Sequence, residues 1–390
     1  MKRWLYGIGV LVIVAIVAVA AFLIFAPAVV ENSMNKVVAV PLKITPEARA
    51  LHAQLQVADM HADSLLWERD LLSRSTRGQV DLPRLVDGNV ALQVFSSVTK
   101  TPKGQNYDAN SADSDNITPL TIADLQPIRT WTSLLQRSLW HATKLDRFAA
   151  ASGGQLRVIH TSADLDALLA DRAKGSKVTG GMLSIEGLQD LEGKLDNLDV
   201  LHAAGFRMAG MAHFFDNDVA GSMHGEQKGG LTPLGRQVVA RMERIGMIVD
   251  IAHSSHETIA EILKMATRPV VASHGGVQAT CKVNRNLTDD EIRGVAATGG
   301  VVGIGYWDAA VCGTSPVQVA AAIAHVRDVG GIDHVGLGSD FDGAVTTGFD
   351  TGKLAAVTQA LIDRGLSRED IAKVMGGTVL RVIRAGIVPR

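Results

Sequence analysis

Eight short apolar runs, each followed by a polar loop and a helical pattern, constrain the fold of this chain more than any other feature. Most runs are nearly continuous in Val, Ile, Leu, Ala or Met, which is typical of strands buried on both faces. Because strands that alternate with helices pair in parallel, eight such units predict an α/β fold of the (β/α)8 TIM-barrel type. A doubly wound open sheet is the alternative. The runs span residues 55–61, 90–98, 181–185, 206–213, 247–253, 269–274, 300–306 and 334–339.

Helix start and stop signals lie between these runs. Thr232 and Pro233 open a stretch with helical apolar spacing that Gly246 closes. Thr288 and Glu291 have the spacing of a capping box at the start of another helix. A polar stretch followed by a helical pattern predicts an insertion around residues 99–155, within a barrel domain of residues 51–390.

The N-terminus carries a run of 21 residues without a charge, residues 5–25, behind Lys2 and Arg3. At about 1.5 Å per residue, a helix of this length spans a bilayer. The positive charges before the run keep the short tail inside and export the body. We therefore predict a single-pass membrane anchor at residues 1–28, a linker at 29–50 and a periplasmic or extracellular catalytic domain. A cleaved signal peptide is the alternative, because Ala26 to Ala28 resembles a small-residue cleavage site.

Composition narrows the classes of function. The 38 Lys and Arg against 40 Asp and Glu give a net charge of −2, and without a basic stripe we expect no nucleic-acid partner. A hydrophobic content of 47% excludes global disorder. Because the chain has only two cysteines, a zinc module with four cysteine ligands is excluded. Cys281 and Cys312 follow the sixth and seventh runs, so export predicts one disulfide between them; two buried free thiols are the alternative.

Ionisable residues gather at the C-terminal ends of the apolar runs. In a TIM barrel this edge of the strands builds the active site, so we expect these side chains to meet there. Imidazole and carboxylate groups together favour a site for two divalent cations, and zinc is the best match. For any one histidine taken alone, a structural hydrogen-bonding role is the alternative. The residues are His61, Asp63, Glu186, His213, His253, His274 and Asp340.

The same segments carry a family resemblance that covers residues 54–383. The chain resembles the membrane dipeptidase family, the renal-dipeptidase-like branch of the metal-dependent amidohydrolases. The set of motifs in this order is highly specific, although no single one is. The motifs are DMHAD at 59–63, SIEG at 184–187, GLTPLG at 230–235, DIAHS at 250–254, SHGG at 273–276, NRNLTD at 284–289, GSDFDG at 338–343 and GGTVLRV at 376–382.

The resemblance implies an enzyme with two zinc ions per chain. Glu186 would bridge both ions, and its negative charge would offset their mutual repulsion. Asp59 lies two residues before a ligand on the same strand face, and we expect it to orient that ligand rather than to bind metal. The ligands implied are His61 and Asp63 for one ion and His253 and His274 for the other.

The resemblance also implies roles around the substrate. Asp340 would act as acid and base beside a water or hydroxide that bridges the ions, with Glu186 completing the catalytic pair. On the residue pattern alone, Asp342 is the alternative acid. His213 would contact the scissile amide, and Arg285 would receive the terminal carboxylate through two parallel hydrogen bonds. A structural histidine and a surface charge are the respective alternatives for these two.

The leading prediction is therefore a zinc dipeptidase, inserted in the membrane by its N-terminal helix, that hydrolyses dipeptides, including those with a C-terminal D-residue. Because the family commonly dimerises, a homodimer is a further expectation. The second hypothesis is a metal-dependent hydrolase of another amide or lactam, such as a β-lactam or an N-acyl amino acid. The third is a catalytically inactive binding protein. A substrate panel distinguishes the first two, and metal content tests the third.

Overall fold

The computed structural model describes residues 2–388; Met1 and residues 389–390, at the ends of the predicted anchor and barrel domains, lie outside the described residues. An eight-stranded parallel barrel forms its centre, and β10 pairs with β2 to close the ring. Each strand coincides with one predicted run, so the barrel is confirmed over the open sheet. In order around the ring, the strands are β2 (Val57–Ala62), β3 (Val90–Val98), β5 (Thr179–Glu186), β6 (Phe206–Gly210), β7 (Ile248–Asp250), β8 (Val271–Ala272), β9 (Val301–Ile304) and β10 (Val335–Leu337).

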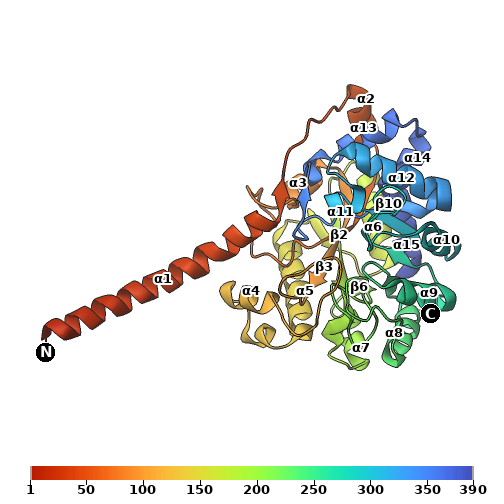
Figure 1. Cartoon of the computed structure of the whole chain (residues 1–390). Helices are drawn as coiled ribbons and strands as arrows, with labels where there is room; N and C mark the ends of the chain where they lie inside the picture. The colour runs from red at the N-terminus through yellow and green to blue at the C-terminus, as the bar shows by residue number, and fades with distance from the viewer. Residues whose placement is uncertain (1, 389–390) are drawn as a thin grey trace.

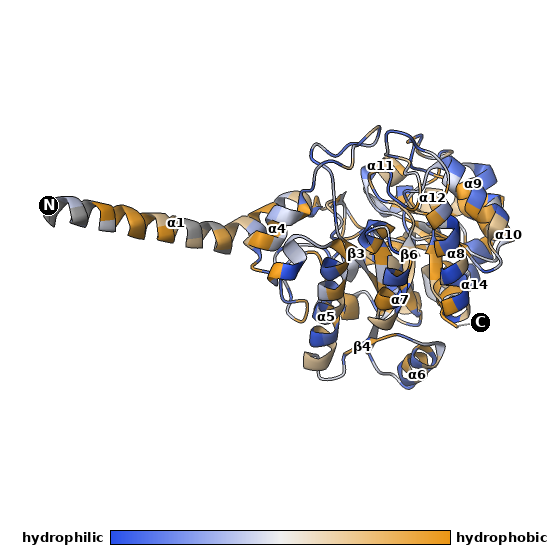
Figure 2. Cartoon of the chain, turned by 90° about the horizontal axis from the view of Figure 1, so that it is seen from below, coloured by the Kyte–Doolittle hydropathy of each residue, from blue (hydrophilic) through white to orange (hydrophobic). Residues whose placement is uncertain are grey.

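Helices surround the barrel (Figure 1). Many of them carry both hydrophobic and hydrophilic residues, as expected for helices that pack one face on a sheet (Figure 2). They are α2 (Pro46–His52), α3 (Leu82–Asp87), α7 (Asp196–Ala203), α8 (Pro233–Ile245), α9 (His256–Met265), α10 (Asp289–Ala297), α11 (Asp308–Val311), α12 (Pro316–Gly330), α13 (Ala355–Asp363), α14 (Arg368–Ala372) and α15 (Thr378–Gly386).

The predicted helix signals act where the sequence places them. The Thr232 side chain accepts a hydrogen bond from the backbone of Gly235 at the start of α8, and Gly246 ends this helix with a φ of 76°. At the start of α10, Thr288 and Glu291 form both bonds of a capping box. These local bonds satisfy backbone groups that a helix end leaves without partners.

The segment between β3 and β5 contains three α-helices, one short 3-10 helix and one further strand. The helices are α4 (Ile117–Ala123), α5 (Leu134–Ala151) and α6 (Ser162–Ala173), and β4 (Leu156–Val158) pairs in parallel with β5. A separate two-stranded sheet joins β1 (Lys36–Val37) to β11 (Thr346–Thr347). The sequence analysis anticipated neither β4 nor this small sheet, because strands of two or three residues carry little hydropathy pattern.

The prediction of a membrane-spanning helix at residues 5–25 is wrong. Over residues 2–388, no helix combines the length and the apolar character that crossing a bilayer requires. The apolar run is instead the first part of α1 (Lys2–Met34), a helix of 33 residues that continues through Pro27. This helix projects from the barrel, and its last turns contact the barrel at the end where α4 lies (Figure 1).

Candidate active site and metal centre

The seven predicted strand-end residues come together in one cluster. His61 lies within β2 and Glu186 is the last residue of β5, while the others lie within three residues after the ends of β2, β6, β7, β8 and β10. Because parallel strands end at the same edge of a barrel, their side chains converge there. None is more than 8% exposed; the set is His61, Asp63, Glu186, His213, His253, His274 and Asp340.

Glu186 occupies the centre of this cluster. Its Oε1 lies 3.0 Å from His253 Nε2 and 3.3 Å from the Nε2 atoms of both His213 and His274. Its Oε2 faces the other way, 3.5 Å from His61 Nε2. One carboxylate thus directs one oxygen at three imidazoles and the other at His61, which is the arrangement expected of a carboxylate that bridges two cations.

The second group of ligand atoms surrounds His61. Its Nε2 lies 3.4 Å from Asp63 Oδ1 and 3.8 Å from Asp340 Oδ1. Within residues 2–388, three sets of residues offer ligand atoms that lie within 4.8 Å of one another. They are His61, Glu186 and His274; Glu186, His213 and His253; and His61, Asp63 and Asp340.

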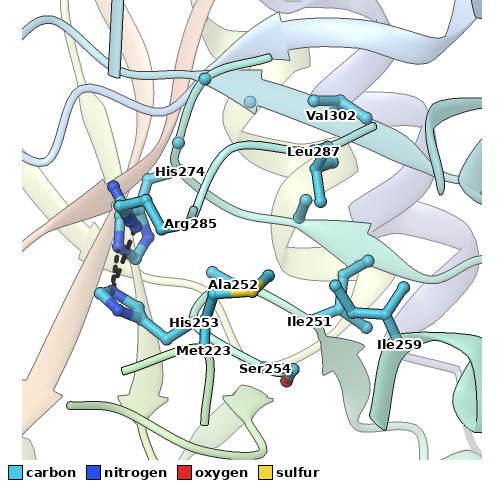
Figure 3. Close-up of a pocket in the computed structure, with 14 residues that line it drawn as sticks. Met223, Ile251, Ala252, His253, Ser254, Ile259, His274, Arg285, Leu287 and Val302 are labelled. Atoms are coloured by element: carbon cyan, nitrogen blue, oxygen red, sulfur yellow. Dashed lines mark hydrogen bonds between the residues drawn. The ribbon is translucent and has the colours of Figure 1, made fainter. Parts of the chain in front are cut away.

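The donor atoms fit a divalent cation. His253 Nε2 and His274 Nε2 face each other at 2.9 Å, although two imidazole nitrogens can share only one proton (Figure 3). Among the described residues, buried His61 Nε2, Asp63 Oδ1 and Glu186 Oε2 lack a hydrogen-bond partner. Converging lone pairs that are buried without partners are costly unless a cation accepts them. Imidazole and carboxylate are also the ligand types that suit zinc.

The charges of the cluster are strongly coupled. Burial raises the pKa of Asp340 well above its usual range; His61 opposes this shift, and the charges of Asp63 and Glu186 add to it. Burial and then Glu186 raise the pKa of Asp63 to about 6. Burial would also raise the pKa of Glu186, but the charges on His213 and His61 outweigh it and hold that pKa well below its usual range. Three buried carboxylates at this density require positive charge among them.

The loop after β10 distinguishes Asp340 from Asp342. The carboxylate of Asp342 accepts hydrogen bonds from Ser64 Oγ and the backbone of Gln79, both at 2.6 Å, and pairs with Arg69. These contacts occupy the carboxylate of Asp342 and stabilise the loop, whereas Asp340 faces His61.

Two of the site residues adopt a backbone conformation that side chains disfavour. His253 has a φ of 62° and Asp340 a φ of 59°. L-residues seldom enter this left-handed region, although Asp and His do so more often than most, and such conformations persist where the surrounding structure fixes them, often at active sites. Each turn directs its side chain into the cluster at the point where its strand has ended.

Asp59 supports the cluster through the backbone. Its Oδ1 accepts hydrogen bonds from the N–H of His61 at 3.0 Å and from Ser339 Oγ at 3.0 Å. It thereby ties β2 to the start of the loop after β10. The chain after β10 also comes close to the chain after β8, which explains Gly338, since a Cβ there would lie 1.8 Å from the carbonyl oxygen of Ser273.

Arg285 lies beside the cluster on the His253 side. Its Nη2 is 3.2 Å from His253 Nε2, and its guanidinium carbon stacks 4.6 Å above the ring of Trp307. Figure 3 shows Arg285 with the two facing imidazoles, apart from the apolar side chains of Ile251, Leu287 and Val302. The side chain is only 5% exposed, so it is not a surface charge.

A cavity of about 540 Å³ opens onto the cluster. Asp63, Glu186, His213, Arg285 and Asp340 all contribute to its lining. Three of the predicted ligands, Asp63, Glu186 and His253, therefore share one cavity with the predicted substrate contacts, and this cavity is large enough for a small peptide.

Several residues around this cavity were not anticipated. Tyr107 and Trp307 line it, and the Trp307 indole donates to the Tyr107 hydroxyl at 3.2 Å. His224 is fully buried, and its ring stacks on Phe214 at 4.5 Å. Tyr107 and His224 lie in loops, away from any strand end, so hydropathy patterns carry no signal for them.

Cys281 and Cys312 form a disulfide that joins the loop after β8 to the turn after α11. The bridge lies four residues before Arg285 in the chain, outside the ligand cluster.

Comparisons with known proteins agree with this geometry. A model of the membrane dipeptidase family, Peptidase family M19, matches residues 45–386. The chain is 29% identical to dipeptidase tcpJ of Claviceps purpurea over 80% of this chain and 70% of that protein. It is 38% identical to dipeptidase aclJ of Aspergillus oryzae, where the match spans 52% of this chain and only half the length of that relative.

Solved structures share the fold. A metallopeptidase from Rhodobacter sphaeroides, liganded with a phosphinate mimic of the dipeptide L-Ala-D-Ala, superposes with a TM-score of 0.70 at 24% identity and covers 85% of this chain and 99% of its own. The probable dipeptidase PvdM from Pseudomonas aeruginosa superposes with a TM-score of 0.74 at 21% identity, over 87% of this chain and 97% of its own.

Proposed function

Because the chain belongs to the membrane dipeptidase family, Peptidase family M19, we propose that its buried cluster holds two zinc ions and hydrolyses the peptide bond of dipeptides. The family makes the enzyme class a metallo-dipeptidase. The observation that carries the proposal is the position of Glu186, whose Oε1 faces His253 and His274 while its Oε2 faces His61. His61 and Asp63 would hold one ion, and His253 and His274 the other.

The residues of this chain supply what the reaction needs around the metals. When bound, two zinc ions polarise the scissile carbonyl and acidify a water molecule. Asp340, at the edge of the cluster, takes the proton of that nucleophile and returns it to the leaving amine. His213 contacts Glu186 from the cavity side and donates to the scissile amide as charge develops on it.

Arg285 explains the preference for dipeptides. Its planar guanidinium, held against Trp307, can pair with a free carboxylate through two parallel hydrogen bonds. An internal residue of a longer peptide has no carboxylate at this position. The L-Ala-D-Ala mimic bound by the Rhodobacter sphaeroides relative supports a substrate with a D-residue on this side.

Hydrolysis of a dipeptide panel that includes L-Ala-D-Ala tests the proposal. We expect hydrolysis by the zinc-loaded chain, loss of activity on chelation, and loss of at least about 10³-fold in kcat in His253→Ala. His256→Ala, a substitution at an exposed histidine three residues further on, serves as the matched control. Zinc binding without hydrolysis of any dipeptide would favour another amide or a lactam as substrate.

A further inference from the structure

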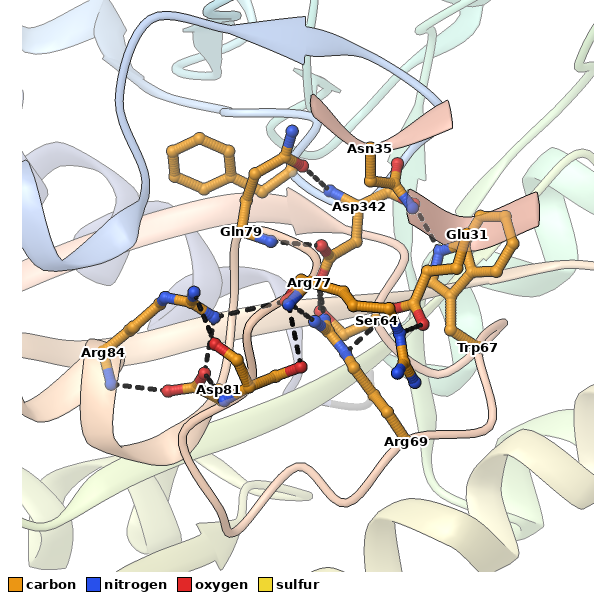
Figure 4. Close-up of polar contacts among 12 residues, drawn as sticks. Glu31, Asn35, Ser64, Trp67, Arg69, Arg77, Gln79, Asp81, Arg84 and Asp342 are labelled. Atoms are coloured by element: carbon orange, nitrogen blue, oxygen red, sulfur yellow. Dashed lines mark hydrogen bonds and ion pairs between the residues drawn. The ribbon is translucent and has the colours of Figure 1, made fainter. Parts of the chain in front are cut away.

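The end of α1 is fixed to the mouth of the barrel by buried ionic contacts (Figure 4). Glu31 is 2% exposed and pairs with Arg69 at 3.2 Å and with Arg77 at 2.8 Å. Arg69 in turn pairs with Asp342, the residue that holds the loop after β10. A buried carboxylate between two guanidinium groups is costly to disrupt, since removing one partner leaves an uncompensated charge.

The residues just after α1 continue this attachment. Asn35 is buried, and its Oδ1 accepts a hydrogen bond from the backbone of Ala344 at 2.8 Å. The next two residues pair with Thr346 and Thr347 as β1 and β11. The N-terminal segment is therefore bonded to the chain that immediately follows Asp340, and α1 is held in a fixed position at the site.

This attachment makes α1 part of the cavity wall. Val30 and Met34 line the cavity that contains Asp63 and Asp340. They stand beside an apolar cluster in which Leu66, Trp67, Val98 and Ile117 pack together with Leu120, and α1 contacts the α4 helix that supplies the last two of these residues.

The cavity consequently has two unlike ends. Trp67 donates to the backbone oxygen of Asp342 at 2.7 Å, which places the apolar end beside the Asp63 and Asp340 side of the cluster. Arg285 occupies the opposite side, next to His253. A dipeptide that places its carboxylate on Arg285 and its peptide bond at the cluster must extend its amino-terminal residue toward α1.

We propose that the end of α1 is a specificity determinant, and that Val30 and Met34 select dipeptides whose amino-terminal residue has a bulky apolar side chain. This inference rests on the proposed dipeptidase function. Burial of an apolar side chain against this wall favours Leu over Gly at the amino-terminal position, because each buried methylene adds to the binding free energy.

Met34→Glu in the full zinc-loaded chain tests this inference, with Leu-Ala and Gly-Ala as probes. We expect the wild type to prefer Leu-Ala by at least about tenfold in kcat/KM. Met34→Glu should remove that preference through KM for Leu-Ala and leave Gly-Ala nearly unchanged. Because Met34 is 42% exposed, the variant folds without burying a charge in the core. Asn32→Glu, an exposed position on the same helix, is the matched control and should behave as the wild type.

Calorimetric binding of phosphinate mimics of the two dipeptides separates this inference from the proposed function. If neither dipeptide is hydrolysed but the Leu mimic binds more tightly in a manner that depends on Met34, the dipeptidase proposal fails, whereas the proposal that Val30 and Met34 select the amino-terminal residue is supported. If the wild type binds both mimics equally, or if Met34→Glu loses the same affinity for both, Val30 and Met34 do not select the amino-terminal residue, even if the dipeptides are hydrolysed. Binding of neither mimic would overturn both.

Discussion

For single residues of the site, the sequence predicts the type of side chain and its position at a strand end, but not its contacts with distant parts of the chain. The ligand types and their positions at strand ends were predicted, because a residue at the end of a buried strand has its place fixed by the barrel. The residue pattern alone left the choice between Asp340 and Asp342 open, and only the family resemblance favoured Asp340, since the contacts that distinguish them involve Arg69, Ser64 and Gln79, which lie more than 250 residues away from Asp342 in the chain. Contacts between residues so far apart in the chain cannot be predicted from local sequence patterns.

Arg285→Lys should raise KM for dipeptides by about 10- to 100-fold and change kcat much less. An ammonium group cannot reproduce the two parallel hydrogen bonds of the guanidinium or its stacking on Trp307. Steady-state kinetics on Leu-Ala and on its C-terminal amide measure this, because the amide lacks the carboxylate. An equal loss on both compounds would place Arg285 outside carboxylate recognition.

Asp190→Asn should change how stability depends on pH. Asp190 is buried, accepts a hydrogen bond from Ser138 Oγ at 2.6 Å, and has a pKa raised by burial from 3.8 to about 7. Between these pH values the folded state binds the proton and the unfolded state does not, so wild-type stability falls as pH rises from about 4 to about 7. The asparagine variant does not titrate, so it should gain up to roughly 4 kcal/mol relative to the wild type over this range.

Urea unfolding of both proteins at pH 4.5 and pH 8 measures this difference. Contributions from His141, which lies in the same buried network through Ser97 and Ser138, cancel because the residue is present in both proteins. A difference between variant and wild type that is the same at both pH values would contradict the assignment.

At the scale of elements, the sequence predicted what short-range chemistry controls. The capping box of α10 and the proline start of α8 were predictable because their partners lie three residues apart. The pairing of β1 with β11 was not predictable, since Lys36 lies opposite Thr346 and neither segment is long enough to show a strand period. The strand β4 was not predicted for the same reason: it has only three residues, and the sequence pattern there indicated only the end of an insertion.

The disulfide between Cys281 and Cys312 joins the loop after β8 to the turn after α11, and its contribution to stability can be tested. It closes a loop across 31 positions of sequence, and losing it frees the unfolded chain. Replacing both cysteines by alanine should lower the free energy of unfolding by about 3 kcal/mol. Denaturant unfolding of the variant and of the oxidised wild type measures the change, and the wild type in the presence of a reductant should match the variant. Equal stability of the oxidised wild type and the double variant would contradict a structural role.

At the scale of the whole molecule, the barrel was predicted from eight apolar runs that alternate with helical patterns. The prediction that the N-terminal helix spans a membrane was wrong. Hydropathy over residues 5–25 is a local property, and it gave no sign that the helix continues to Met34 and places Glu31 between two arginines. Val30 and Met34, which lie in the segment predicted as a linker after the anchor, therefore belong to the end of this helix and line the cavity over the ligand cluster.

The zinc content of the full chain, measured by elemental mass spectrometry, tests the central claim most directly. We predict about two zinc ions per chain in the wild type and a clear loss in Glu186→Gln, because the amide cannot bridge two cations with a shared negative charge. Hydrolysis of Leu-Ala should fall in parallel with the metal. A wild-type chain that binds no zinc, or a Glu186→Gln variant that retains both ions, would contradict the bridging role on which the whole interpretation of the site depends.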